Sequence, residues 1–176
     1  MNPEAGVQNS AFPSLAFVAL GSNLGESRQI ISDAIARLRD FSDSPILMSS
    51  LWQTSPVDCP PDSPLFLNAV VGFGARAAET PESLLKKLQD VEKDFGRRPK
   101  EVLNEPRPLD LDLIMFGEEI RQSPELILPH PRALLRKFVL YPLNEIAPDL
   151  ILPGQMKTVS ELLKEFRGKE NVERLV

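Results

Sequence analysis

Four apolar runs along this chain predict β-strands. They lie at residues 15–20, 46–54, 65–73 and 109–116, and turn-forming or proline-containing segments separate them. The last run reads LDLDLIMF, so its apolar character is interrupted by Asp110 and Asp112. A further short apolar stretch at residues 138–140 predicts an additional strand.

The segments between these strands carry apolar residues at helical spacing. A helix beginning near Ser27 has its apolar stripe at residues 30, 31, 34, 35 and 38. A second helix is expected from Thr80, a good N-cap followed by Pro81, to about Phe95. A third is expected from about Thr158.

The resulting order of elements, β-α-β-β-α-β, is typical of an α+β fold. It predicts a ferredoxin-like sandwich with a C-terminal extension. Residues 1–14 lack such periodicity and are expected to form a flexible N-terminal extension. Residues 15–176 are then a single domain, which suits a chain of 176 residues with 42% hydrophobic content.

Charge and cysteine content narrow the classes of function. The formal net charge of −5 argues against a broad surface for nucleic acid or anionic membranes. The single cysteine, Cys59, has no intramolecular partner, and the first apolar run is too short for a signal sequence or a membrane span. We expect a cytoplasmic protein, and nothing in the sequence indicates an obligate protein partner.

The two aspartates of the fourth strand are the most informative residues. Side chains two apart on a strand share a face, so Asp110 and Asp112 project from one side of an otherwise apolar strand. Neighbouring carboxylates repel unless a cation or a proton compensates them, and oxygen ligands favour Mg²⁺. Arg107, just before the strand, adds a group that can bind phosphate. An edge strand with a solvated acidic face is the alternative.

Other phosphate and metal sites are disfavoured. The chain has no P-loop motif, and its glycine pattern at residues 72–77 ends before the helix that would receive a dinucleotide pyrophosphate. One histidine and one cysteine cannot build a usual zinc site.

Several further residues have two interpretations when taken singly. Gln89 and Glu92 share a side of the second helix, where both could be ordinary surface residues. Asn68 lies within a strand, where it could cap an edge or bind the polar edge of a heterocycle. Phe66 and Phe138 could be core residues or stacking surfaces.

Taken together, four motifs resemble the 6-hydroxymethyl-7,8-dihydropterin pyrophosphokinase family. They are ALGSNL at residues 19–24, Thr54 followed by FLNA at 66–69, PRPLDLDL at 106–113, and PHP at 129–131 followed by Arg136 and Phe138. The resemblance spans residues 15–152. It implies Mg²⁺-dependent transfer of pyrophosphate from ATP to the hydroxymethyl group of a reduced pterin, giving AMP, in folate biosynthesis.

The resemblance also implies roles for individual residues. Asp110 and Asp112 are expected to hold two Mg²⁺ ions and, with Arg107, to form the catalytic set. ATP, as co-substrate, is expected to be bound by Gln89, Glu92, Arg97, Arg107, Leu113, His130 and Arg136. The reduced pterin is expected to be bound by Thr54, Val57, Phe66, Asn68 and Phe138.

The sequence departs from the family's pattern in the loop that precedes the strand of Asp110 and Asp112. Many relatives carry Arg-Trp-Gly where this chain has Leu103, Asn104 and Glu105, so closure of residues 96–105 over the nucleotide is in question.

Two alternative functions remain. A ferredoxin-like RNA-binding module is the alternative from another class, and a plain kinase or a metal phosphodiesterase is the alternative among enzymes. The net charge of −5 and the paired acids argue against the RNA-binding module.

Overall fold

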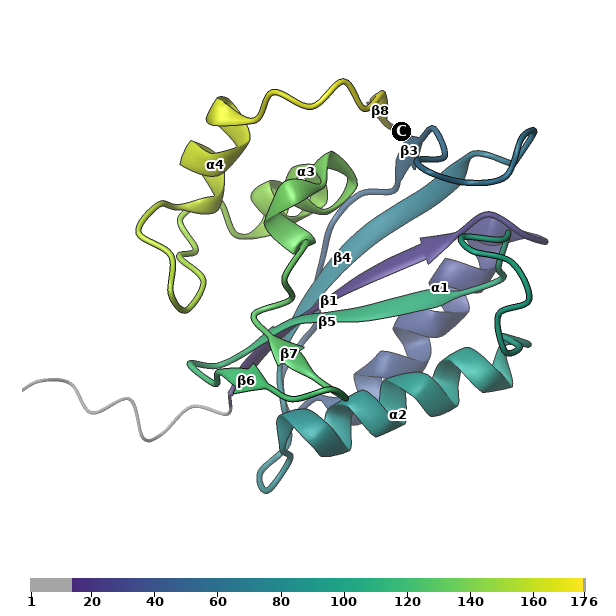
Figure 1. Ribbon diagram of the computed structural model, residues 1–176. Helices are drawn as coiled ribbons and strands as arrows, with labels where there is room; N and C mark the ends of the chain where they lie inside the picture. Colours follow the sequence, from purple (N-terminus) through teal and green to yellow (C-terminus); the bar gives the residue numbers. More distant parts are fainter. Residues whose placement is uncertain (1–13, 176) are drawn as a thin grey trace, which may run out of the picture.

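A computed structural model describes residues 14–175 of the chain (Figure 1). Of the predicted N-terminal extension, residues 1–13 lie outside the described residues. The carbonyl of Ser14 accepts a hydrogen bond of 2.9 Å from the N–H of Ala75. Among the described residues, no helix is long and apolar enough to cross a membrane.

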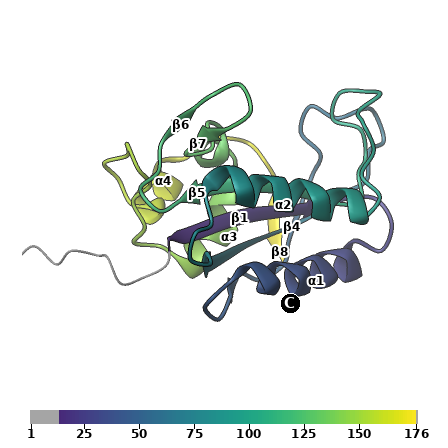
Figure 2. The same cartoon turned by 90° about the horizontal axis from the view of Figure 1, so that it is seen from below.

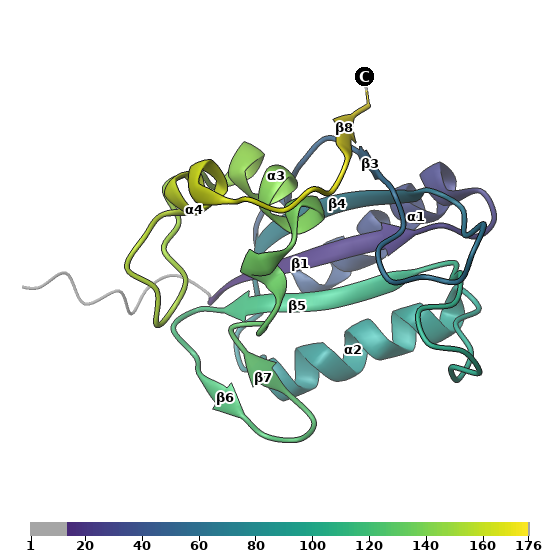
Figure 3. The ribbon, with the colours of Figure 1, turned by 45° about the horizontal axis from the view of Figure 1, so that its top comes forward.

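The centre of the molecule is a six-stranded sheet in which every pairing is antiparallel (Figure 3). Its strand order is β5-β1-β4-β3-β8, with β2 also pairing with β4. The strands are β1 (Leu15–Ser22), β2 (Leu47–Met48), β3 (Trp52–Thr54), β4 (Phe66–Gly74), β5 (Asp110–Phe116) and β8 (Val172–Arg174). A separate pair, β6 (Arg121–Gln122) and β7 (Ile127–Leu128), follows β5.

Two long helices cover one face of the sheet, as the apolar spacing predicts (Figure 2). They are α1 (Ser27–Leu38) and α2 (Pro81–Asp94). Thr80 caps α2 in a reciprocal box with Ser83, and Pro81 is the first helical residue, so the predicted start of this helix is confirmed. Their apolar stripes pack against side chains such as Val18 and Val71, which point to this side of the sheet.

The opposite face is covered by α3 (Lys137–Ile146) and α4 (Val159–Glu165), with Thr158 as the N-cap of α4. The predicted strand at residues 138–140 is therefore wrong. Its apolar run is too short to distinguish a strand from a buried helix by pattern alone. Val139, Leu140 and Leu143 share one face of α3 and pack against the sheet, and this burial favours the helix.

The predicted strand at residues 46–54 is divided into β2 and β3. Two serine residues between β2 and β3 make hydrogen bonds that a regular strand would not make. Ser49 Oγ accepts from the N–H of Val70 at 3.0 Å, and the N–H of Ser50 donates to Glu145 at 3.1 Å. These local bonds compete with the regular pattern between strands. Short 3₁₀ turns at Arg39–Phe41 and Ala133–Leu135 complete a mixed α/β fold with an antiparallel sheet and four helices.

Candidate active site

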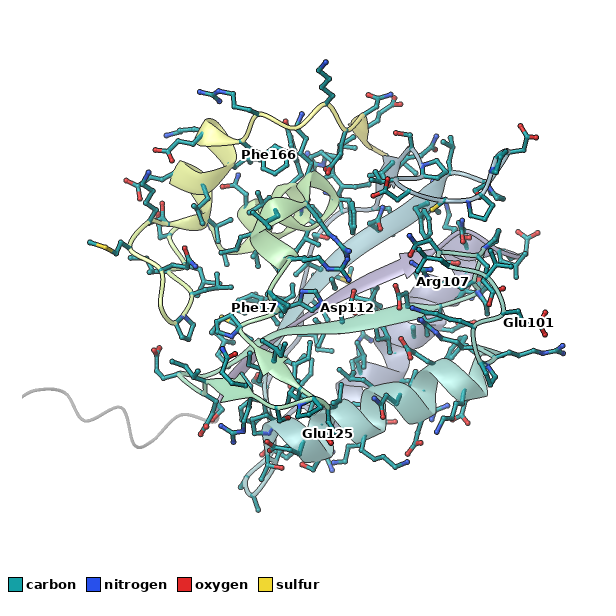
Figure 4. The ribbon with its side chains drawn as sticks, in the orientation of Figure 1. Phe17, Glu101, Arg107, Asp112, Glu125 and Phe166 are labelled. Atoms are coloured by element: carbon teal, nitrogen blue, oxygen red, sulfur yellow. The ribbon has the colours of Figure 1, made fainter. Side chains whose placement is uncertain are left out.

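A cavity of about 290 Å³ lies on the face of the sheet that carries α3. Its floor is formed by β1, β4 and β5, and its rim by the start of α3, residues 55–59 and Asn104. Figure 4 shows Asp112 and Arg107 on this side of β5. The cavity brings together nine of the residues expected from the sequence: Thr54, Val57, Phe66, Asn68, Arg107, Asp110, Asp112, Arg136 and Phe138.

Strand alternation explains why the two acids face this cavity. Leu111 and Leu113 point into the core beneath α1 and α2, so Asp110 and Asp112 point to the other side. In the register of the sheet, Gly21 of β1 lies opposite both Asn68 and Asp110. A Cβ at Gly21 would lie 3.3 Å from Asn68 Oδ1, so glycine keeps the floor of the cavity open.

The two carboxylates have different surroundings. Asp110 is paired with Arg97 and with Arg107, whose Nε lies 3.2 Å from Asp110 Oδ2. Burial tends to raise the pKa of Asp110, but the two arginines outweigh it and hold the pKa below its usual value. Burial and the negative charge of Asp110 raise the pKa of Asp112 to about 6. Among the described residues, no hydrogen-bond donor serves Asp112, so its carboxylate is the natural place for a cation.

Behind Asp110, Glu92 and Arg97 form a nearly enclosed group. Glu92 Oε1 accepts hydrogen bonds from the N–H of Leu111 at 2.7 Å and from Arg97 Nη1 at 3.1 Å. Only 14% of the Glu92 side chain and 18% of the Arg97 side chain are exposed. Burial raises the pKa of Glu92 to about 7 in spite of these two donors. Arg97 is thus joined to β5 twice, directly at Asp110 and through Glu92 at Leu111.

Two of the arginines that line the cavity lie beside aromatic rings. The guanidinium of Arg107 lies 5.3 Å from the ring centre of Phe66, and that of Arg136 lies 5.4 Å from Phe138. Asn23 fixes the main chain of Arg107, because its Oδ1 accepts from the N–H of Arg107 at 2.9 Å. The turn after β1 thus positions a residue that precedes β5.

Thr54 and Asn68 present a polar edge to the same cavity. Asn68 Nδ2 donates to Thr54 Oγ1 at 2.8 Å, and both side chains are buried. This bond leaves the Thr54 hydroxyl hydrogen free to donate and Asn68 Oδ1 free to accept. Such a donor and acceptor match the amide-like edge of a heterocycle. The rings of Phe66 and Phe138, which line the wall of the cavity, can stack on the faces of such a heterocycle.

Five residues expected to bind ATP do not line this cavity: Gln89, Glu92, Arg97, Leu113 and His130. Gln89 is exposed on α2, and Glu92 lies behind β5. The Leu113 side chain is buried in the core under α2, so only its main chain could meet a ligand. His130 Nε2 lies 4.0 Å from Asp112 Oδ1, next to the cavity. Burial lowers the pKa of His130, and the nearby Arg136 and Arg132 lower it further.

Arg97 lines a second pocket, formed mainly by residues 96–101 and 105–108, and Arg107 lines both pockets. The sequence did not indicate several other residues of the first cavity. They are Ser55, Asp58, Cys59, Arg132, Leu135 and Glu170, whereas Ala19 and Leu20 belong to the ALGSNL motif. Arg132 follows the PHP motif and could have been found from it, whereas Glu170 lies in a polar segment without a motif.

Comparison with known proteins places the chain in a family. The model of the 7,8-dihydro-6-hydroxymethylpterin-pyrophosphokinase (HPPK) family matches residues 17–148. A Pseudomonas aeruginosa protein named 2-amino-4-hydroxy-6-hydroxymethyldihydropteridine pyrophosphokinase is 40% identical over 160 residues, which cover 90% of this chain and 95% of the relative. The folic acid synthesis protein fol1 of Pneumocystis carinii is 39% identical over 146 residues, covering 83% of this chain but 19% of that protein.

A solved structure supports the fold. The wild-type HPPK-DHPS of Plasmodium falciparum, crystallised with pteroate, matches with a TM-score of 0.66 at 14% identity. The match covers 86% of this chain and 42% of that chain, so the present chain spans less than half of the two-part protein. The family match and the 40% identical relative carry the assignment. The chain therefore belongs to the HPPK family of pyrophosphokinase enzymes.

Proposed function

We propose that this enzyme transfers pyrophosphate from ATP to the hydroxymethyl oxygen of 6-hydroxymethyl-7,8-dihydropterin, giving AMP, in folate biosynthesis. The observation that carries the proposal is one cavity that joins Asp110 and Asp112 to the polar edge of Thr54 and Asn68. Membership of the HPPK family supports the same reaction. The phosphates of ATP and the polar edge of the pterin would then lie next to each other on the floor of one cavity.

The donor set fits Mg²⁺. Asp110 and Asp112 supply carboxylate oxygens on one face of β5, and Asp112 needs a positive partner. The described residues contain no group of three or more His, Cys, Asp or Glu that could hold a metal ion. The two aspartates would therefore share two Mg²⁺ ions with the ATP phosphates and water. Bound Mg²⁺ supplies neutralisation of phosphate charge and a lower pKa for the attacking hydroxyl.

The protein's own residues would position the two reactants. Phe66 and Phe138 hold the pterin ring, and Thr54 and Asn68 fix its orientation. Arg107 and Arg136 lie close enough to the aspartates to act on their charge, and there they would stabilise charge on the phosphoryl oxygens. The hydroxymethyl oxygen forms a bond to the β-phosphorus, the bond from that phosphorus to the bridging oxygen of AMP breaks, and the hydroxyl proton is released.

On the ATP side, we assign Gln89, Glu92, Arg97, Leu113 and His130 to the nucleotide. Leu113 would contribute only main-chain atoms, since its side chain lies in the core. Arg97 would act mainly through Asp110 and Glu92, because its guanidinium is paired with both. His130 faces the cavity margin beside Asp112, where its imidazole would be neutral at pH 7.

We also propose that residues 15–176 act as one domain whose core is the ferredoxin-like sandwich. The order β5-β1-β4-β3, with α1 and α2 on one face, supports this topology. The C-terminal strand β8 pairs with β3 and so extends the same sheet.

One incubation separates the proposed reaction from its rivals. The protein is mixed with ATP, Mg²⁺ and 6-hydroxymethyl-7,8-dihydropterin, and the nucleotide products are resolved. We expect AMP in amounts equal to the pyrophosphorylated pterin. Formation of ADP would indicate a plain kinase, and AMP that forms without the pterin would indicate a phosphodiesterase. In a separate binding assay, a salt-sensitive shift of RNA without Mg²⁺ would favour the RNA-binding module instead.

The Asn68→Ala variant tests the polar edge of the pterin site. Loss of Asn68 removes one acceptor and leaves Thr54 Oγ1 without its donor, so pterin affinity should fall by about 1–3 kcal/mol. ATP affinity should hardly change. Titration calorimetry with each ligand measures both values, and Thr54→Ser, which keeps the hydroxyl, is the matched control. A steep fall in melting temperature, with both ligands weakened equally, would make Asn68 a structural residue.

The loop at residues 96–105 already has one contact across the mouth of the cavity. Asn104, which stands where the family resemblance leads us to expect a tryptophan in many relatives, donates from Nδ2 to the carbonyl of Asp58 at 2.8 Å. Both residues line the cavity. Without the tryptophan plane, closure over the ligands would rest on this bond and on phosphate contacts from Arg98 or Lys100, since Arg97 is paired.

We therefore expect Asn104→Ala to lower turnover several-fold while ATP affinity changes little, because closure excludes water from the reacting atoms. Leu103→Ala is the control, since Leu103 is 75% exposed in the same loop.

The reverse change should have the opposite effect. Leu103→Arg combined with Asn104→Trp should raise the rate or tighten pterin binding. Hydrogen exchange of residues 97–105 should slow when both ligands are present. Exchange that does not respond to the ligands would show that the loop is not a lid.

A further inference from the structure

The C-terminal segment returns to the cavity along the edge of the sheet. Strand β8 pairs with β3, with Val172 opposite Thr54. Beyond the paired residues, the N–H of Ser55 donates to the carbonyl of Asn171 at 3.4 Å. These contacts bring Glu170 beside the strand that carries Thr54, and Glu170 lines the cavity. The family model ends at residue 148, so it assigns no role to this segment.

Glu170 also contacts the helix on the other side of the cavity. Its Oε2 accepts a hydrogen bond of 2.6 Å from the N–H of Lys137, the first residue of α3. The N-cap residue Arg136 makes no side-chain cap, and the first turn of α3 contains no acid. A helix leaves its first N–H groups without partners and favours negative charge there. Glu170 supplies both the acceptor and the charge from a distant part of the chain.

The capped residue lies between two residues of the site. Arg136 precedes Lys137 and Phe138 follows it, and both line the cavity. Fixing the main chain of Lys137 therefore fixes the direction of the Arg136 guanidinium and the Phe138 ring on either side. A second bond, from Lys137 Nζ to the carbonyl of Glu170 at 3.4 Å, joins the same two residues.

Strand β8 is tied to the far end of α3 as well. Glu145, near the end of that helix, pairs with Arg174 at 3.1 Å and accepts from Trp52 Nε1 at 3.0 Å. Arg174 Nη2 also donates to Ser50 Oγ at 2.8 Å. The segment that carries Glu170 is thus held to both the sheet edge and α3. This support gives Glu170 a defined position at the wall of the cavity.

From these contacts we propose that Glu170 is a positioning residue of the pterin site, acting through the N-terminus of α3 on Arg136 and Phe138. The proposal rests on the proposed function, since it assumes that the cavity binds the pterin. Glu170 needs no contact with the reacting atoms. Its effect is to keep the ring of Phe138 and the charge of Arg136 in place before substrate arrives, which lowers the loss of freedom on binding.

Three variants of the full chain test the proposal. Glu170→Ala should raise the KM for the pterin roughly five- to tenfold, with the KM for ATP nearly unchanged. Glu170→Gln retains an oxygen acceptor for the N–H of Lys137 and should stay within about twofold of the natural protein. Glu173→Ala, at an exposed acid of β8 a few residues further along the chain, should change neither value.

Hydrogen exchange of the ligand-free protein provides a readout that does not depend on activity. Glu170→Ala should speed exchange of amides 137–138, and Glu170→Gln should largely restore their protection. If the natural protein made no AMP, the proposed function would fail while this exchange would still test the cap. Unchanged exchange and pterin KM in Glu170→Ala would overturn the proposal. So would a Gln variant that restores the protection of amides 137–138 but binds the pterin as poorly as the Ala variant, since the charge of Glu170 would then act outside the cap.

Discussion

Asp112→Asn should abolish pyrophosphoryl transfer, with turnover reduced at least about a thousandfold, while the protein remains folded. The substitution keeps the size of the side chain but removes the negative charge that would attract Mg²⁺. The pKa of Asp112 is raised to about 6, so folding disfavours its charged form. Above that pH the ionised carboxylate lowers stability, and its removal should leave the melting temperature at pH 8 unchanged or slightly higher.

The neighbouring acid should behave differently. Asp110→Asn should also abolish turnover, but it removes the partner of Arg97 and Arg107 and should lower the melting temperature. The pKa of Asp110 is lowered, so its charge stabilises the fold above the ordinary pKa and this contribution disappears in acid. Kinetics at saturating Mg²⁺ and melting curves of both variants test this contrast, with the exposed Asp149→Asn as control. Full turnover in Asp112→Asn would contradict the assignment of the metal site.

The parts of the fold that the sequence predicted are those with long periodic patterns. The residues of α1 and α2 repeat at helical spacing over three or more turns, and Thr80 with Pro81 marks the start of α2. The segment that became α3 was misassigned because Phe138 and Val139 suit either structure. Strand β8 was missed, since its three residues contain one apolar side chain and depend on pairing with β3.

In the candidate site, too, the sequence predicts what a local pattern determines and misses what depends on contacts across the chain. Asp110 and Asp112 could be paired from sequence because a single strand determines their common face. The same alternation indicates that Leu113 points to the other side, into the core, although the family resemblance includes it in the ATP site. Contacts across long stretches of chain, such as those of Asn104 with Asp58 and Glu170 with Lys137, have no local signal. They depend on how loops and the C-terminal segment return to the cavity.

Arg97 is the clearest case in which the geometry changes an expected role. The resemblance implies a contact with ATP, whereas the guanidinium is paired with Glu92 and Asp110 and also donates to the carbonyl of Leu109 at 3.3 Å. These partners leave 18% of its side chain exposed. Removal of one member of a buried ionic group leaves the other charges without compensation, and this is strongly destabilising.

We therefore expect Arg97→Met to lower the free energy of unfolding by about 3 kcal/mol at pH 8 in the absence of Mg²⁺. Arg97 lowers the pKa values of both Glu92 and Asp110, so its loss should raise them. Protonation then relieves the uncompensated charge, and the destabilisation should be smaller at pH 5.5 than at pH 8. Arg98→Met, at the exposed neighbouring arginine, should have little effect on stability.

Magnesium provides the decisive comparison for Arg97. If the ion binds at Asp110 and Asp112, it supplies positive charge where the guanidinium is missing, so Mg²⁺ should raise the melting temperature of Arg97→Met more than that of the natural protein. Denaturant unfolding at both pH values, with and without Mg²⁺, measures these differences. An unchanged melting temperature combined with a raised KM for ATP would assign Arg97 to the phosphates. A melting temperature that falls and partly recovers with Mg²⁺ would instead show that Arg97 holds the acidic strand ready for the metal.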